Sequence, residues 1–190
     1  MRIVGGRLGG RRIAAPRGQS TRPTSERVRE GIASALEARG RFEGAVVLDL
    51  FAGTGALGFE ALSRGAARAV LVEKDAALAR AIEKGARELG VGAEVSVLAL
   101  DLERPPRTWM ARLPDVRFDL VFLDPPYARI DVVTTLLAAL SESGKLSPDA
   151  AIVVEHARRG PPTLPDAFSE IATYRYGDTA VLLRTLKERP

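Results

Sequence analysis

The chain has 190 residues, 46% of them apolar and 27% charged, and no cysteine. This composition is typical of one soluble globular domain, and it excludes disulfides, cysteine-based zinc sites and, because no apolar run reaches about 18–20 residues, a membrane-spanning segment. The net charge of +4 at pH 7 is uneven, because residues 1–41 hold ten arginines against three acids, which suggests that the leading segment meets a polyanion.

Residues 1–23 are rich in Gly, Arg and Pro and are predicted to form a basic arm or a short hairpin. Arginine suits phosphate contact, since its planar guanidinium pairs two oxygens at once. The alternative is a composition in which Arg replaces Lys throughout, because the rest of the chain is also rich in Arg. We expect one larger domain over residues 24–190, with no signal peptide and located in the cytoplasm.

Residues 24–40 are predicted to form the first helix. Thr24 is placed to cap its N-terminus, Glu26 lies in its first turn, and Gly40 ends it. The apolar residues that recur at helical spacing are Val28, Ile32, Ala35 and Leu36.

From residue 45 onward, apolar runs alternate with segments of helical periodicity, which predicts an α/β fold with a mostly parallel sheet and helices on both of its faces. The last two strands, separated by Gly177-Asp178, are predicted to form an antiparallel hairpin. The expected strands cover residues 45–53, 66–75, 93–101, 118–124, 150–156, 170–177 and 179–186, and the expected helices cover residues 55–65, 76–91, 107–113 and 132–144. Ligands of such sheets bind beyond the carboxyl ends of the strands, so the residues that end each strand are the candidates for a site.

A glycine-rich turn follows the first of these strands. Gly53, Gly55 and Gly58 form the pattern G-x-G-x-x-G between a strand and a helix, and Glu73 ends the next strand. Such an acid can accept hydrogen bonds from both hydroxyls of an adenosine ribose, in a dinucleotide or in S-adenosylmethionine. Asp49 stands just upstream of the glycines, where a carboxylate would repel a pyrophosphate but attract a sulfonium or an α-amino group, so the pattern favours S-adenosylmethionine.

Asp101 ends the third expected strand. Its carboxylate could accept a hydrogen bond from the adenine amine, with the backbone N–H of Leu102 facing a ring nitrogen. The equally acceptable alternative is a helix N-cap or a solvated acid in a turn.

The sequence Asp-Pro-Pro-Tyr follows the fourth expected strand, which must end at Asp124 because proline cannot donate to a sheet. Methylation of an exocyclic base amine requires the nitrogen lone pair to point at the methyl donor. Asp124 and the Pro125 carbonyl can each accept one amine hydrogen, Pro126 stiffens the turn, and Tyr127 offers a face for stacking worth about 1–3 kcal/mol. The alternative is a strand terminator with an incidental tyrosine.

The segments DLFAGTGALGFEALSRGA and FLDPPY resemble those of the amino-methyltransferase group of class I S-adenosylmethionine-dependent enzymes. Together with RIVGGRLGGRRI, TRPTSERVREGIASAL and YGDTAVLLR, they make the chain similar to the RsmD family, which methylates the N2 amine of a guanine in 16S ribosomal RNA. The resemblance implies a Rossmann-like fold with a seven-stranded, mostly parallel sheet and an antiparallel C-terminal hairpin.

The resemblance also implies roles for particular residues. Asp49, Phe51, Ala52, Gly53, Thr54 and Gly55 would contact S-adenosylmethionine, with Glu73 on the ribose and Asp101 and Leu102 on the adenine. Asp124, Pro125, Pro126 and Tyr127 would hold the guanine. The RNA backbone would be met by Arg7, Arg11, Arg12, Arg22 and Arg27. The expected substrate is small-subunit rRNA, within a 30S particle or an assembly intermediate, and the expected state is a monomer.

Other functions remain open from the residues alone. An acid followed by Pro-Pro-Tyr is also found in amine methyltransferases that act on DNA or on protein glutamine. The same fold is also compatible with a nucleotide-dependent oxidoreductase or with a nucleic-acid-binding protein that has no enzymatic activity. No cluster of residues has metal-ligand spacing. His156, the single histidine, is interpreted as a satisfied turn residue rather than a catalytic base.

Overall fold

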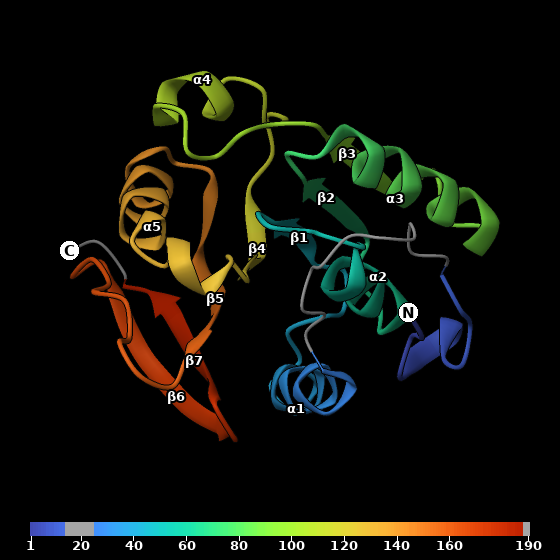
Figure 1. The fold of residues 1–190 in the computed structure, drawn as a ribbon, viewed down its shortest axis with the longest axis horizontal. Helices are drawn as coiled ribbons and strands as arrows, with labels where there is room; N and C mark the ends of the chain where they lie inside the picture. The colour runs from blue at the N-terminus through green and yellow to red at the C-terminus, as the bar shows by residue number, and fades with distance from the viewer. Residues whose placement is uncertain (14–24, 188–190) are drawn as a thin grey trace. The chain divides into compact units, whose positions relative to one another are not determined.

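The computed structural model describes residues 1–13 and 25–187 of the chain. The chain divides into two compact units, Met1–Leu100 and Asp101–Pro190. The seven strands of the described residues form a mostly parallel sheet with an antiparallel C-terminal pair and are accompanied by helices, which confirms the predicted fold class (Figure 1). The predicted boundary between an arm of residues 1–23 and the larger domain lies outside the described residues.

The first unit contains three parallel strands, β1 (Val46–Asp49), β2 (Arg68–Val72) and β3 (Val95–Leu98). β2 lies between the other two strands. Asp49 is in register with Leu71, and Val72 with Leu98, so β1 and β2 end at nearly the same level. The carboxyl ends of these strands therefore face one edge, as the sequence predicts.

Three α-helices belong to the first unit: α1 (Glu26–Glu37), α2 (Ala56–Ser63) and α3 (Ala76–Leu89). The N-cap of α1 is Ser25, whose hydroxyl accepts a hydrogen bond from the Val28 N–H at 3.2 Å. The prediction of Thr24 as the cap was therefore wrong by one residue. Ser25 stands three residues before the N–H that it satisfies, which is one of the two spacings open to an N-cap side chain.

Residues 1–13 belong to the same unit and fold back on themselves through a short antiparallel pairing of Arg2 with Arg12. The 3₁₀ turn η1 (Gly6–Leu8) lies within this segment. The buried Glu60 carboxylate on α2 accepts hydrogen bonds from the N–H groups of Val4 and Gly5 at 2.8 and 2.9 Å. The apolar side chains that anchor the segment are Ile3, Leu8 and Ile13.

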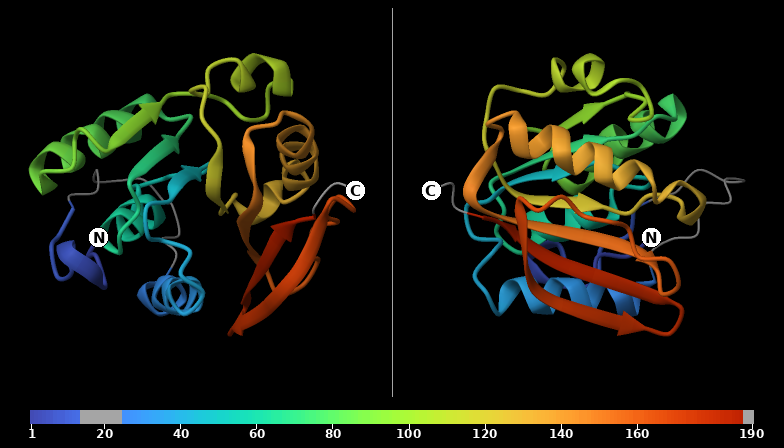
Figure 2. Two further views of the ribbon diagram at one scale, coloured as in Figure 1. Left: turned by 180° about the vertical axis from the view of Figure 1, so that it is seen from behind. Right: turned by 90° about the vertical axis from the view of Figure 1, so that its left-hand side faces the viewer.

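The second unit contains β4 (Phe118–Leu123), β5 (Leu146–Ala157), β6 (Phe168–Tyr176) and β7 (Thr179–Leu186). β4 and β5 are parallel, whereas β7 is antiparallel to both of its neighbours, β5 and β6. Both views of Figure 2 show β6 and β7 as a long two-stranded ribbon. The predicted closing hairpin is therefore confirmed, with its turn at Gly177-Asp178.

The helical segments of the second unit are α4 (Pro106–Met110), the 3₁₀ turn η2 (Tyr127–Arg129) and α5 (Val132–Glu142). The core side of α5 consists of Val133, Leu136, Leu137 and Leu140. In the part of the chain that the structure describes, no helix is long and apolar enough to cross a membrane.

Candidate active site

The turn between β1 and α2 is built from backbone hydrogen bonds and glycines. The Ala52 N–H bonds to the Val72 carbonyl at 2.9 Å, and the Gly55 N–H closes the turn on the Ala52 carbonyl at 2.6 Å. Gly53 and Gly55 have φ values of 55° and 79°, in the left-handed region that other residues avoid. The tight turn predicted from the G-x-G-x-x-G pattern is therefore confirmed.

Two of the glycines also permit close packing. A Cβ on Gly55 would lie 2.6 Å from a ring carbon of Phe59, and a Cβ on Gly58 would lie 2.2 Å from a methyl group of Leu71 on β2. A Cβ on Gly53, by contrast, would meet no atom of residues 1–13 and 25–187 closer than 4.0 Å. The backbone at Gly53 is thus the part of the turn that a ligand can approach.

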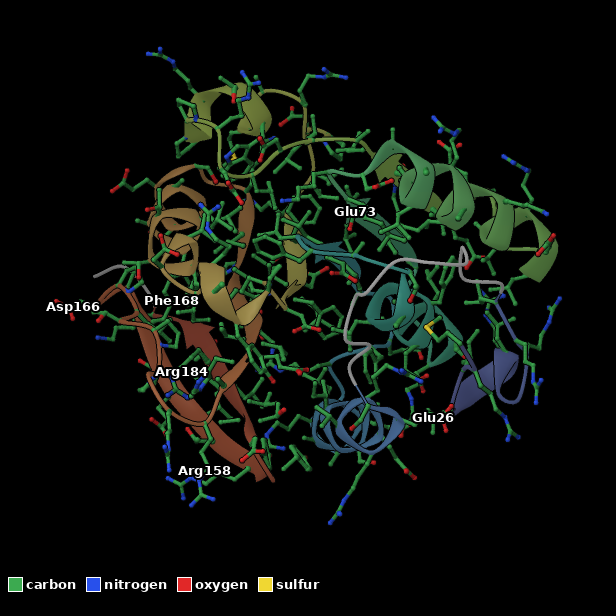
Figure 3. All side chains as sticks on the ribbon, viewed as in Figure 1. Glu26, Glu73, Arg158, Asp166, Phe168 and Arg184 are labelled. Atoms are coloured by element: carbon green, nitrogen blue, oxygen red, sulfur yellow. The ribbon has the colours of Figure 1, made fainter. Side chains whose placement is uncertain are left out.

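Glu73 holds this turn in place from the end of β2 (Figure 3). One carboxylate oxygen accepts a hydrogen bond from the Gly53 N–H, and the other from the Asp75 N–H, each at 2.9 Å. A carboxylate oxygen has two lone pairs, so each can still accept a second hydrogen bond. The ribose role of Glu73 stays a prediction, to which the structure adds a positioning role for the glycine turn.

The remaining residues assigned to the donor have different environments. Asp49 is 1% exposed and is the last residue of β1, while Phe51 and Thr54 are half-buried. The Thr54 hydroxyl lies 3.3 Å from the Met1 sulfur. The donor contacts of Asp49, Phe51, Ala52 and Thr54 stay predictions.

Asp101 forms the turn at the start of the second unit. Its carboxylate accepts a hydrogen bond from the Glu103 N–H at 3.0 Å, and Leu102 between them is buried. An acid in a turn is one of the alternatives that the sequence left open, and the adenine roles of Asp101 and Leu102 stay predictions. An ion pair of 2.6 Å between Glu103 and Arg129 ties this turn to η2.

The Asp-Pro-Pro-Tyr segment begins one residue past the end of β4. The strand ends at Leu123 rather than Asp124, because its last registered pair is Leu123 with Val154 of the parallel β5. Asp124 is half-buried, and Pro125 is buried. The Pro126 carbonyl accepts a hydrogen bond from the Arg129 N–H at 2.7 Å, and the amine contacts of Asp124 and the Pro125 carbonyl stay predictions.

Tyr127 is held by a residue that sequence reasoning missed. Its hydroxyl lies 2.8 Å from the hydroxyl of Thr179, the first residue of β7, which is 5% exposed. Thr179 pairs with Ala157 at the carboxyl end of β5, so the β6–β7 turn lies at the same end of this unit as Tyr127. Only the pairing of β5 with β7 brings these residues together, 52 positions apart in the chain.

His156 differs from its predicted turn environment, because it lies within β5 and is 2% exposed. Its Nδ1 lies 2.6 Å from the Ala157 carbonyl, so Nδ1 carries the proton, since a carbonyl only accepts. Nε2 has no hydrogen-bond partner among the described residues. Burial, reinforced by Arg184, lowers the pKa of His156, against the opposing effect of the Ala157 carbonyl. In the described residues, no group of three or more His, Asp or Glu side chains could hold a metal ion.

The arginines assigned to RNA have unequal environments. Arg11 donates to the carbonyls of Leu89 and Glu88 at 2.8 and 2.7 Å and so caps the end of α3, and Arg7 pairs with the Glu94 carboxylate. Arg12 and Arg27 are exposed. Arg22 lies outside the described residues. The structural contacts of Arg7 and Arg11 are sufficient to explain them, and the RNA role of all five stays a prediction.

Comparison with known proteins extends over nearly the whole chain. A family model described as conserved hypothetical protein 95 matches residues 1–185. The ribosomal RNA small subunit methyltransferase D of Escherichia coli is 35% identical over 170 residues, which cover 89% of this chain and 81% of that protein. The "Putative rRNA methyltransferase YlbH" of Bacillus subtilis is 34% identical over 96% of this chain and 97% of its own length.

A solved structure agrees with these relatives. The "Putative methyltransferase yhhF" of Escherichia coli superposes with a TM-score of 0.83 at 32% identity, over 100% of this chain and 99% of that one. The resemblance drawn from the sequence is thereby confirmed. The chain belongs to the conserved hypothetical protein 95 family, that is, the RsmD family of class I methyltransferases.

Proposed function

We propose that this chain is a 16S rRNA (guanine-N2)-methyltransferase that uses S-adenosylmethionine. Family membership supports the reaction class and rRNA as the substrate. The single observation that carries the chemistry is the Asp-Pro-Pro-Tyr segment at the carboxyl end of β4, with Tyr127 fixed by Thr179. An acid, a stiffened carbonyl and an aromatic ring are what a planar base amine needs to be held for methylation.

The glycine turn fits S-adenosylmethionine. The Glu73 carboxylate beside the approachable backbone at Gly53 offers acceptors for ribose hydroxyls, and the buried Asp49 carboxylate would attract a cationic group and repel a pyrophosphate. When bound, S-adenosylmethionine supplies a methyl group activated by a sulfonium. Glu73 would orient the ribose, and Asp49 would face the positive charge.

The residues of the second unit would prepare the acceptor. Asp124 and the Pro125 carbonyl would each accept one hydrogen of the guanine N2 amine, which reduces the delocalisation of the nitrogen lone pair into the ring and directs it at the methyl donor. Tyr127 would stack on the base and fix its plane. The amine gains the methyl group and then loses a proton to water, so the reaction needs placement more than a strong base.

We also propose the form of the substrate, the oligomeric state of the protein and the compartment in which it acts. The substrate rRNA is bound within a 30S particle or an assembly intermediate, the protein acts as a monomer, and it works in the cytoplasm. A folded RNA surface would supply the phosphate contacts that a single domain of this size needs for affinity.

The experiment is methyl transfer from labelled S-adenosylmethionine to three substrates: unmethylated 30S particles, naked 16S rRNA and duplex DNA. We expect incorporation into rRNA, and mass mapping of nuclease fragments should locate it on the N2 atom of one guanine. Label on DNA or on a protein glutamine would contradict the proposal. Transfer to 30S particles but not to naked rRNA would establish the particle as the substrate.

A further inference from the structure

Three arginines gather at the turn end of the β6–β7 hairpin. Arg158 and Arg159 directly follow β5, and the Arg158 N–H bonds to the Asp178 carbonyl in the hairpin turn at 2.7 Å. Arg175 lies near the end of β6, paired with Ala180. All three arginines are exposed. Figure 3 shows Arg158 at the turn end of the hairpin, with Phe168 and Asp166 at the opposite end.

These arginines lack the ion pairs that other arginines of the same unit make. Arg184 on β7 pairs with Glu170 at 2.9 Å, and Arg129 pairs with Glu103. Within residues 25–187, Arg158, Arg159 and Arg175 have no acidic partner. The two segments that form this end, residues 157–160 and 175–180, hold three arginines and one acid, Asp178. Their charge is therefore available to an external anion.

The connection of this basic end to Tyr127 through Thr179 suggests a function for its arginines. Thr179 follows Asp178 in the turn, and its hydroxyl lies 2.8 Å from the Tyr127 hydroxyl. The aromatic ring proposed to stack on the target base is thus anchored to the first residue of β7, directly beside the turn next to which the three arginines lie. A nucleotide cannot enter the site without its own phosphates lying beside the base, and arginine pairs phosphate oxygens two at a time.

We propose that Arg158, Arg159 and Arg175 form an RNA-binding surface that holds the phosphate backbone flanking the target nucleotide. The inference rests on the proposed function, because it assumes that Tyr127 receives a base. It adds an RNA contact on the C-terminal hairpin to the one predicted for the N-terminal segment, in which Arg7 and Arg11 make structural contacts. The surface contacts phosphates, so it sets affinity and orientation rather than base identity.

The test compares two variants with equal loss of charge. The first carries Arg158→Gln, Arg159→Gln and Arg175→Gln. The control carries Arg107→Gln, Arg112→Gln and Arg117→Gln, three exposed arginines of the same unit that also lack an acidic partner among the described residues. Binding of the 16S rRNA substrate is measured from 50 to 200 mM salt, and KM and kcat are measured with 30S particles. Thermal unfolding checks that both variants fold.

Each phosphate contact contributes about 0.7–0.9 to the slope of log affinity against log salt. We expect the slope for the hairpin variant to be shallower by roughly two units than that of the unaltered chain. Raising the salt from 50 to 200 mM should therefore weaken RNA binding by the hairpin variant roughly tenfold less than it weakens binding by the unaltered chain. The KM of the hairpin variant should be raised and its kcat almost unchanged. The control variant should keep the slope of the unaltered chain. An equal loss in both variants, or none in the hairpin variant, would overturn the inference.

The remaining outcomes separate this inference from the proposed function. If the unaltered chain neither binds nor methylates rRNA, the proposed function fails and the inference fails with it. If the unaltered chain is active and the hairpin variant behaves like it, only the inference fails. A loss confined to 30S particles, without any change on naked rRNA, would assign the surface to a ribosomal protein and so also contradict the inference.

Discussion

The units Met1–Leu100 and Asp101–Pro190 hold their candidate site residues in different ways. In the first unit the backbone determines the shape of the site. Glycines with positive φ form the turn after β1, and Glu73 accepts hydrogen bonds from two backbone N–H groups that hold the turn in place. In the second unit the geometry depends on side chains and rigid prolines, and the Tyr127 side chain in η2 is positioned by the Thr179 hydroxyl on β7. Substitutions in the first unit should therefore weaken binding of the methyl donor by distorting the turn. Substitutions in the second unit should slow the reaction by removing single functional groups.

The largest effect is expected from Asp124→Ala. Removing the acceptor of an amine hydrogen should lower kcat by on the order of 100-fold or more, because the lone pair loses its orientation. The affinity for S-adenosylmethionine, measured by calorimetry, should stay within about twofold, a change too small to count as a lost hydrogen bond. Asp124→Asn is the matched control, since its carbonyl oxygen still accepts a hydrogen bond and should retain part of the activity. A collapse of donor affinity in Asp124→Ala would show that the roles are assigned to the wrong unit.

Gly55→Ala should destabilise the first unit through both strain and packing. The new Cβ would occupy a left-handed conformation and stand 2.6 Å from a Phe59 ring carbon, so the free energy of unfolding should fall by about 2–4 kcal/mol. Gly90→Ala is the control, because its φ of 77° is similar but no atom of the part of the chain that the structure describes lies within 4 Å of the new Cβ. Urea unfolding should give about 1 kcal/mol for the control. Equal losses would mean that packing at Gly55 is unimportant.

Glu73→Gln should act on donor binding rather than on turnover. Loss of the carboxylate weakens charge-assisted hydrogen bonds worth about 1.5–3 kcal/mol, so the dissociation constant for S-adenosylmethionine should rise about 10- to 100-fold. At saturating donor, kcat should be nearly that of the unaltered chain. A fall in kcat without a change in donor affinity would break the division between the two units.

The pair formed by Tyr127 and Thr179 should give a smaller effect. Thr179→Val and Tyr127→Phe each remove one hydroxyl of a hydrogen bond worth about 1 kcal/mol, so kcat/KM should fall about fivefold in each, with donor affinity unchanged. Because both changes break the same bond, the double variant should be no worse than either single variant. Thr179→Ser keeps the hydroxyl and should retain activity. Fully additive losses would exclude a positioning role.

The smallest effect concerns His156 and pH. Its pKa is lowered in the folded protein by burial, so as the pH falls the unfolded chain takes up a proton first. The stabilisation given by the neutral imidazole is therefore present above the ordinary pKa near 6.5 and is lost as the pH falls through the folded-state pKa. Urea unfolding between pH 7.5 and 5 should show this decline, and His156→Gln should remove that part of it. If the free energy of unfolding depended on pH in the same way in the unaltered chain and in His156→Gln, His156 would have the same pKa in the folded and unfolded states.

Local sequence determined much of this protein. The glycine turn, the acid ending β2, the Pro-Pro terminator of β4 and the closing hairpin were all predictable, because each depends on backbone rules that act over a few residues. The end of β4 and the cap of α1 were each displaced by one residue. Boundaries are poorly predicted because the deciding hydrogen bonds cost little to shift by one position.

Only the tertiary structure decided which distant residues meet. Nothing near Thr179 in the sequence points to Tyr127, and nothing near Arg11 points to the last carbonyls of α3. The same holds for Arg158, whose place beside the hairpin turn follows from the pairing of β5 with β7. Local propensity fixes the type of each element, but partners across strands are chosen by burial and register, which depend on the whole chain at once.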